Sequence, residues 1–276
     1  MEKFSVLISV YHKEKPSYLK AALESIYDWQ TVRPDEIVIV KDGYLGWELD
    51  MVCDDFFDQY PSVVKIIEIN ENVGLGIALH IGLKHCSYNL VARMDSDDIS
   101  FPYRFELQLH RFESDSSLSI VGGWINEFSA ISEIVEGQRR VPQSDEELTI
   151  FMKNKSPFNH MTVMFKKDDV LRAGSYERFY LLEDYWLWGR MKFFGMKFYN
   201  IQRPLVKVRG GIDMIARRGG VKYALSEVRL QYNFYRLKII SLPKMLKNIF
   251  LRFLIRIAPT KVRSYLYRRY LRWEVG

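Results

Sequence analysis

The chain has few cysteines and no long apolar segment, and both features narrow the class of protein. Two cysteines, Cys53 and Cys86, fall in expected helices and lack the spacing of metal ligands. They indicate reduced, buried thiols of a cytosolic protein rather than a disulfide framework. No uninterrupted apolar run approaches the roughly 20 residues of a membrane-spanning helix. The first residues lead directly into an expected strand, without a signal-peptide pattern.

Two common phosphate-binding motifs are also missing. No Gly-Lys-Ser/Thr sequence occurs, which argues against a P-loop. The turn Asn72-Val73-Gly74-Leu75-Gly76 lacks the third glycine of a dinucleotide fingerprint. This turn is explained either as a phosphate loop or as a helix start that needs tight backbone geometry.

Charge is distributed unevenly along the 276 residues. Residues 1–200 contain 22 Lys+Arg and 31 Asp+Glu, whereas residues 201–276 contain 18 and 3. An acidic body with a basic C-terminal segment indicates an anionic surface as a partner, either a membrane or a nucleic acid. Apolar residues make up 48% of the chain, enough for the core of one large domain, with or without an appendage.

Short apolar runs alternate with helical patterns in the first hundred residues. Strands are expected at 4–10, 36–40, 63–69 and 90–94, and helices at 17–29, at 45–59 and from the turn at 70–76 to about residue 86. This alternation predicts an α/β fold with a doubly wound, mostly parallel sheet. Later in the chain, residues 126–150 look irregular apart from a helix near 145–152, and 159–165 look strand-like.

Three carboxylates, Asp95, Asp97 and Asp98, follow the expected strand at 90–94. Open α/β sheets bind ligands in the crevice beyond the carboxyl ends of their strands. Mg²⁺ prefers oxygen ligands, so this cluster is interpreted as a metal-diphosphate platform. The alternative is a solvated acidic loop before the next helix. Asp42 and Asn72 stand at two other strand ends, which favours the platform.

A second acidic pair, Glu183-Asp184, opens an expected aromatic helix. One interpretation is a favourable interaction with the helix dipole. The other is a carboxylate in a partly apolar pocket that accepts a proton.

The C-terminal segment contains two amphipathic helical patterns. In 241–257, apolar residues recur at helical spacing between Lys244, Lys247, Arg252 and Arg256. After Pro259, a second pattern covers 262–273. Basic residues beside aromatic ones suit anionic lipid headgroups, which favours membrane contact. The alternative is a helical pair that packs on the domain with a solvated basic face. No recognised nucleic-acid module is present, so nucleic acid is not expected as a partner.

Taken together, these motifs resemble the family 2 inverting glycosyltransferases with the GT-A fold. The resemblance is strongest to bacterial members that build O-antigen, capsule or exopolysaccharide, such as the amylovoran-type enzymes. It covers roughly residues 4–210. The matching segments are Ser9-Val10-Tyr11 with Glu14, Asp42-Gly43, Asn72-x-Gly74, Asp95-Ser96-Asp97, Pro102-Tyr103-Arg104, Asn159-His160-x-Thr162 and Glu183-Asp184-Tyr185.

The resemblance implies a role for each matching residue. Asp184 would be the general base, supported by Glu183. Asp97, with Asp95 and His160, would hold Mn²⁺ or Mg²⁺. The residues expected at the nucleotide-sugar are Val10, Tyr11, Glu14, Asp42, Asn72, Gly74, Arg93, Asp95 and Ser96. Those expected on the acceptor side or in support of the site are Asp98, Arg104, Trp186 and Arg190.

The resemblance also implies a reaction and an organisation. A sugar would pass from a UDP-sugar to a hydroxyl of a polyprenyl-diphosphate-linked glycan, forming a β-linkage at the inner face of the bacterial cell membrane. Residues 1–215 would be the catalytic domain, with a nucleotide half of about 1–100 and an acceptor half of about 101–215. Residues 216–276 would be the basic, membrane-associating helical extension. The alternatives are a nucleotidyltransferase and a non-catalytic nucleotide-sugar or glycan-binding module.

The sequence departs from the family pattern in two respects. Trp186 stands where relatives often carry a smaller or acidic residue, and Gly189 is small within the same helix. Both departures bear on the choice of sugar and acceptor rather than on the reaction class. The Q-x-x-R-W motif is absent, so the processive, membrane-spanning synthase subtype is not expected.

Overall fold

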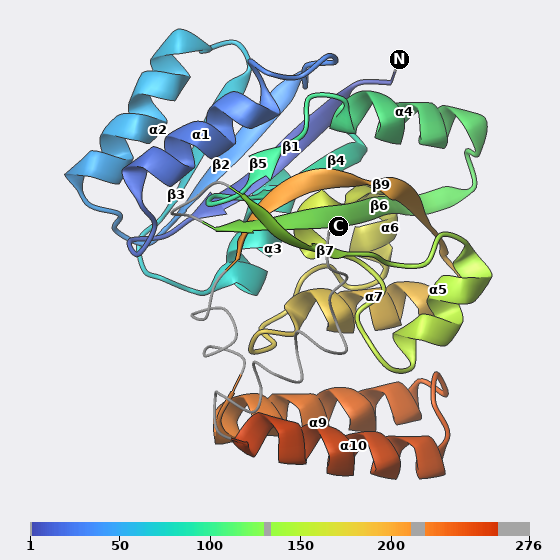
Figure 1. The fold of residues 1–276 in the computed structure, drawn as a ribbon. Helices are drawn as coiled ribbons and strands as arrows, with labels where there is room; N and C mark the ends of the chain where they lie inside the picture. The colour runs from blue at the N-terminus through green and yellow to red at the C-terminus, as the bar shows by residue number, and fades with distance from the viewer. Residues whose placement is uncertain (1, 130–133, 211–218, 259–276) are drawn as a thin grey trace.

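A computed structural model describes residues 2–129, 134–210 and 219–258. Its centre is a nine-stranded sheet in the order β3-β2-β1-β4-β8-β6-β9-β5, with β7 paired to β6 (Figure 1). The strands are β1 (Phe4–Val10), β2 (Glu36–Asp42), β3 (Val64–Ile69), β4 (Leu90–Asp95), β5 (Ile99–Ser100), β6 (Leu118–Ser129), β7 (Val135–Arg139), β8 (Met164–Lys166) and β9 (Lys197–Gly210).

Helices cover both faces of this sheet. The helices described are α1 (Pro16–Ile26), α2 (Trp47–Gln59), α3 (Leu75–His85), α4 (Arg104–Ser114), α5 (Asp145–Met152), α6 (Lys167–Arg172), α7 (Glu183–Phe193), and α9 (Val221–Arg236) and α10 (Leu242–Ile257), which do not touch the sheet directly, with a 3₁₀ turn, η1, at His160–Thr162. Side chains of α1, α2 and α4 share one apolar core. Those of α3, α5, α6, α7 and α9 share the core on the other face.

The first four long strands form the parallel half of the sheet. β1 lies between β2 and β4, and β3 pairs with β2, all in parallel. Every residue of β2 is buried, as expected for a strand that helices cover on both faces. Parallel strands end at the same edge, so the chain segments after β1, β2 and β4 lie next to one another. This arrangement confirms the mostly parallel α/β sheet that the apolar runs predicted.

Two expectations for the second half of the chain were wrong. Within 126–150, the segments 126–129 and 135–139 are not irregular, because β6 continues to Ser129 and pairs in antiparallel fashion with β7. Residues 159–165 do not form one strand, because a 3₁₀ turn occupies 160–162. Asn159 Nδ2 donates to the Gly123 carbonyl (2.8 Å) and Thr162 Oγ1 accepts from the Gly123 amide (3.1 Å). These side-chain bonds replace the backbone ladder of a strand.

Helices α9 and α10 form a pair at the far side of α5 and α7 from the sheet (Figure 1). The ring of Phe234 in α9 stacks edge-on against Tyr185 in α7, 5.1 Å between centroids. Asn248 in α10 donates to the carbonyl of Lys153 at the end of α5 (3.0 Å). The pair is therefore packed on the domain. The second amphipathic pattern, at 262–273, lies outside the described residues. Among the described helices, none has the length and apolarity to cross a membrane.

Candidate active site

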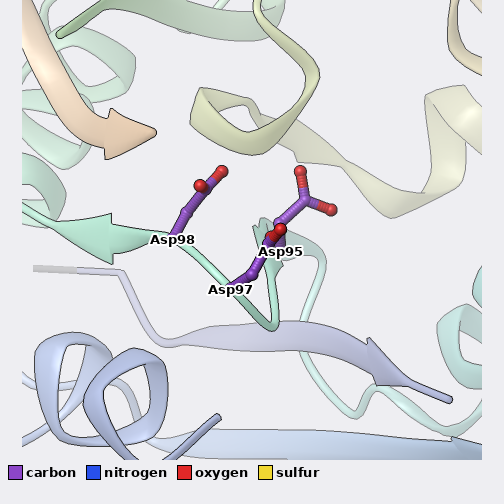
Figure 2. Close-up of side chains that lie close together, drawn as sticks. All are labelled: Asp95, Asp97 and Asp98. Atoms are coloured by element: carbon purple, nitrogen blue, oxygen red, sulfur yellow. The ribbon is translucent and has the colours of Figure 1, made fainter. Parts of the chain in front are cut away.

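The acidic cluster lies in the turn between β4 and β5. Asp95 is the last residue of β4, and the carboxylates of Asp95, Asp97 and Asp98 have oxygen atoms within 4.8 Å of one another. Figure 2 shows the three side chains gathered around one space beside this turn. Ser96 Oγ, on the same turn, donates to Glu14 Oε2 (2.8 Å). The turn thus joins the β1–α1 loop to the end of β4.

Arg93 lies beneath this cluster and is 1% exposed. Its guanidinium forms an ion pair with Asp95. Burial lowers the pKa of Arg93, but the neighbouring carboxylates, Asp95 above all, raise it by more, so the side chain stays charged. Its Nε and Nη1 atoms have no hydrogen-bond partner within the described residues. Arg93 therefore pairs with Asp95 from the buried interior, where it is shielded from solvent.

Negative charge at the cluster is only partly compensated by this arginine. Asp98 is 2% exposed, and burial together with the charges of Asp97 and Asp95 raises its pKa well above the usual range. Oxygen-only ligands with excess negative charge are the chemistry that Mg²⁺ and Mn²⁺ require. A divalent cation would add positive charge among these carboxylates, so the residues present fit such an ion.

The predicted nucleotide-binding residues of β2 and the following turn form one hydrogen-bonded unit. Asp42 is buried, and its carboxylate accepts hydrogen bonds from Val73 N (2.8 Å), Gly74 N (3.1 Å) and Asn72 Nδ2 (3.2 Å). Gly74 has a φ of 85°, which favours glycine, and is the N-cap of α3. Asp42 thereby fixes the turn that starts α3. These three donors already occupy the carboxylate of Asp42. A contact between Asp42 and the nucleobase stays a prediction.

Val10 and Tyr11 lie at the neighbouring strand end. Val10 is the last residue of β1 and is fully buried, while Tyr11 is partly exposed just beyond it. In the register of β1 and β4, Ser9 is opposite Asp95, so the backbone of Val10 and Tyr11 runs beside the acidic turn. The structure thus brings the first-strand motif next to the acidic cluster.

The second acidic pair forms the first turn of α7. Glu183 is 8% exposed, and burial, reinforced by the charge of Asp184, raises the pKa of Glu183 to about 7. Gly76 of α3 packs directly against this region. A Cβ atom at position 76 would lie 2.4 Å from the Glu177 carbonyl oxygen and 3.2 Å from Glu183 Cβ. Helix α3 therefore connects the turn at 72–74 to the start of α7.

His160 is the first residue of the 3₁₀ turn η1 and contacts Tyr176. Its Nε2 atom is 2.9 Å from the hydroxyl of Tyr176. Burial, and then the charge of Arg93, holds the pKa of His160 well below its usual value, so the imidazole is neutral. The carboxylate grouping found among the described residues does not include His160. A role for His160 as a metal ligand stays a prediction.

Arg104, Arg190 and Trp186 make contacts that hold the segments around the site, and their acceptor-side role stays a prediction. Arg104 is fully buried and donates to the Arg93 carbonyl (2.7 Å), which holds the end of β4. Arg190 is buried in α7 and donates to Glu177 Oε1 (2.9 Å). Trp186 is partly exposed, and its indole N–H donates to Glu177 Oε2 (2.8 Å). Arg190 and Trp186 therefore hold the segment that leads into α7.

Arg209 at the end of β9 is a site residue that the sequence motifs did not indicate. Its Nε donates to the Asp97 carbonyl (2.7 Å), and its backbone N–H donates to Asp98 Oδ1 (3.0 Å). Its guanidinium stacks over the ring of Tyr18, 3.9 Å from the centroid. The pairing of β9 with β5 brings it to the cluster. Tyr176, the partner of His160, was also missed, because it lies sixteen residues from His160 in sequence and the fold brings the two together.

Comparison with known proteins agrees with this geometry. Residues 5–172 match the model of Glycosyl transferase family 2. The chain is 41% identical over 270 residues to an Escherichia coli UDP-Gal:alpha-D-GlcNAc-diphosphoundecaprenol beta-1,3-galactosyltransferase, covering 98% of this chain and 97% of that protein. It is also 41% identical over 266 residues to the amylovoran biosynthesis glycosyltransferase AmsE of Erwinia amylovora, covering 96% and 98%.

Solved structures share the fold at low sequence identity. S. aureus TarS 1-349 in complex with UDP-GlcNAc has a TM-score of 0.66 at 16% identity, covering 98% of this chain and 76% of that chain. The mannosyltransferase PcManGT from Pyrobaculum calidifontis, in complex with GDP-Man and Mn²⁺, has a TM-score of 0.63 at 14% identity, covering 98% and 81%. The expected GT-A fold is thereby confirmed. The family match, together with two relatives aligned over nearly their full length, shows that the chain belongs to glycosyl transferase family 2.

Proposed function

We propose that this glycosyltransferase moves a hexose from a UDP-sugar to a hydroxyl group of a polyprenyl-diphosphate-linked glycan, with inversion at the anomeric carbon. The carrying observation is that two acidic groups lie near each other: Asp95 of the cluster Asp95, Asp97 and Asp98 is one of the charges that raise the pKa of Glu183 in the pair Glu183-Asp184. The cluster is suited to hold a metal ion that binds a diphosphate, and the pair is suited to accept a proton. The full-length relative named for UDP-Gal and a diphosphoundecaprenol acceptor makes UDP-galactose the first donor to test.

The donor would lie across the carboxyl ends of β1, β2 and β4. Tyr11, Glu14 and Asp42 would face the nucleobase, and Asp95 the ribose. Asp97, with Asp95, would hold Mn²⁺ or Mg²⁺, whose positive charge stabilises a departing diphosphate without a proton transfer. Arg93 beneath the turn would limit the repulsion among the carboxylates while leaving their oxygens available.

The acceptor hydroxyl would approach from the side of α7. Asp184 would take its proton as the hydroxyl oxygen attacks the anomeric carbon, a contribution of about 10²- to 10⁴-fold. Glu183 would support Asp184 from the buried side of the helix. A single displacement from an α-linked donor gives a β-linkage, and no protein nucleophile takes part.

A lipid-linked acceptor would bring the enzyme to the cytoplasmic face of the bacterial cell membrane as a peripheral protein. Such a product suits O-antigen, capsule or exopolysaccharide assembly. The amylovoran enzyme among the full-length relatives supports this setting.

Calorimetric titration of UDP with and without Mn²⁺ tests the donor site. We expect metal-dependent binding in the wild type, loss of that dependence in Asp97→Ala, and no change in Asp58→Ala, which removes an exposed carboxylate on α2. Equal, metal-independent binding of UDP by the wild type and Asp97→Ala would contradict the role of Asp97 as a metal ligand.

A transfer assay with UDP-galactose and a GlcNAc-diphosphate-lipid acceptor tests the reaction. Asp184→Asn should keep UDP binding and lose at least about 10²-fold in kcat. Product NMR should show a β-anomer. Unchanged turnover in Asp184→Asn would contradict the base assignment, and release of pyrophosphate would indicate a nucleotidyltransferase instead.

A further inference from the structure

Helix α10 carries an apolar face that nothing in the described part of the chain covers. Along it, exposed side chains recur at every fourth residue, and others lie beside that row. They are Leu242, Leu246, Phe250, Leu251, Leu254 and Ile255. Phe250 is 64% exposed and Leu246 57%. Exposed apolar patches that are contiguous mark interaction surfaces, whereas single exposed apolar residues do not.

The basic residues of α10 are not all available to a partner, which corrects the expectation of a basic face. Arg252 and Arg256 both form ion pairs with Glu227 of α9, which is 2% exposed. Arg252 Nη2 also donates to the Asn154 carbonyl. These two arginines therefore tie α10 to α9 and to the domain. What α10 presents outward is mainly its apolar face.

The surface of the helix pair around this face is positively charged. Glu227 is the one acidic residue of 219–258, and it is buried. Exposed basic residues of the two helices and their linker are Lys222, Arg229, Arg236, Lys238 and Lys247. An apolar face with basic residues and no exposed carboxylate around it matches the interface of an anionic bilayer.

We propose that the apolar face of α10 enters the headgroup region of an anionic lipid bilayer, with the surrounding lysines and arginines at the lipid phosphates. This proposal rests on the proposed function, because a lipid-linked acceptor is found at such a surface. The charges argue against other occupants. A second copy would oppose two positive surfaces, and residues 259–276 hold five basic residues and one acidic residue, so they repeat this charge.

Membrane docking through α10 would also fix the position of the active site relative to the bilayer. Phe234 of α9 lies so close to Gly189 of α7 that a Cβ at 189 would be 2.4 Å from its ring. Ser226 Oγ of α9 donates to the carbonyl of Tyr180, three residues before α7 (2.8 Å). The helix pair thus connects the bilayer surface to the helix that begins with Glu183 and Asp184. The base would be held at a fixed height above the lipid.

Vesicle flotation of the full-length protein tests the surface. The probes are phosphatidylcholine vesicles with and without phosphatidylglycerol. The double variant Leu246→Gln/Phe250→Gln should partition onto anionic vesicles at least about tenfold more weakly than the wild type, because it removes two exposed apolar side chains. Trp47→Gln, at a 68% exposed aromatic of α2, is the matched control and should bind like the wild type. Equal partition of the double variant and the wild type would overturn the proposal.

Thiol labelling tests whether the apolar face of α10 is covered instead by a second copy of the chain or by residues 259–276. Both native cysteines are buried, so in Phe250→Cys the introduced thiol should react rapidly with a maleimide in solution and be protected on anionic vesicles. Protection in solution would overturn the proposal. Light scattering would then separate a second copy from the chain's own C-terminal segment.

An acceptor with a short, water-soluble lipid separates this proposal from the proposed function. The double variant should transfer sugar to it at the wild-type rate and lose turnover only on vesicle-borne acceptor. Absence of transfer by the wild type on both acceptors would contradict the proposed function while leaving the vesicle result valid.

Discussion

Replacement of Gly76 by alanine tests whether α3 positions the base. The added Cβ would lie 2.4 Å from the Glu177 carbonyl oxygen and 3.2 Å from Glu183 Cβ, whereas ordinary contacts begin at 3.4 Å. The nearest atom belongs to the backbone, so no side-chain rotation can relieve the contact. Helix α3 and the segment leading into α7 must separate by about 1 Å, and overpacking of this kind costs about 1–3 kcal/mol.

The same separation moves Glu183 and Asp184 away from the donor side. A misplacement of about 1 Å at a reacting group costs on the order of 10²-fold in rate. Gly76→Ala should therefore lower kcat by about 10²-fold while UDP affinity changes little. The measurement is steady-state transfer kinetics alongside UDP calorimetry and urea unfolding.

Gly82→Ala in the same helix is the matched control. A Cβ at position 82 would lie 2.5 Å from both Leu7 Cδ1 and Val40 Cγ2, side chains of the sheet. It should destabilise the protein to a similar extent, about 1–3 kcal/mol, but leave kcat nearly unchanged. Equal losses of kcat in the two variants, or wild-type turnover in Gly76→Ala, would refute the idea that α3 sets the position of α7.

Three further substitutions address charge. Because the pKa of Glu183 is raised from 4.5 to about 7, the wild type loses stability as the pH rises through this range and the buried carboxyl ionises. Glu183→Gln does not ionise, so its free energy of unfolding in urea, relative to that of the wild type, should rise by up to about 3 kcal/mol from pH 4 to pH 8. Burial raises the pKa of Glu227, but its two arginine partners lower it by more; Glu227→Gln should cost about 3 kcal/mol at pH 7, and less as pH falls below 4.5, where the wild type loses the same pair. Arg93→Met leaves Asp95 without its buried partner and should lower thermal stability, and Mn²⁺ should raise the melting temperature of this variant more than that of the wild type.

The parallel half of the fold could be predicted from the sequence because its strands are buried on both faces. Such strands appear as continuous apolar runs, of which Ile37-Val38-Ile39-Val40 is the clearest. Strand β7 has no such run. It reads Val-Glu-Gly-Gln-Arg and exists because β6 offers it a partner. The 3₁₀ turn at 160–162 depends on side-chain bonds to Gly123, nearly forty residues away, which no local pattern reveals.

The site was predictable where its residues are neighbours in sequence. Asp95, Asp97 and Asp98 form one short motif, as do Glu183 and Asp184. Arg209 was not predictable, because it meets Asp97 only across the sheet. Similarly, helical periodicity indicated that α10 is amphipathic. It could not reveal that Arg252 is bound to a buried carboxylate 25 residues earlier, which changes the outward face from basic to mainly apolar.

Helix α3 explains why the turn at 72–74 and the pair Glu183-Asp184, more than a hundred residues apart in sequence, form one site. At its start, the carboxylate of Asp42 binds the amides of Val73 and Gly74, so the helix begins at a point fixed by β2. Within its first turn, Gly76 allows the backbone of the segment before α7 to approach closely. The distance from the donor side to Glu183 is therefore set by a short stretch of one rigid helix rather than by the long chain between them. Glycine at 76 is needed because any larger residue would lengthen that distance.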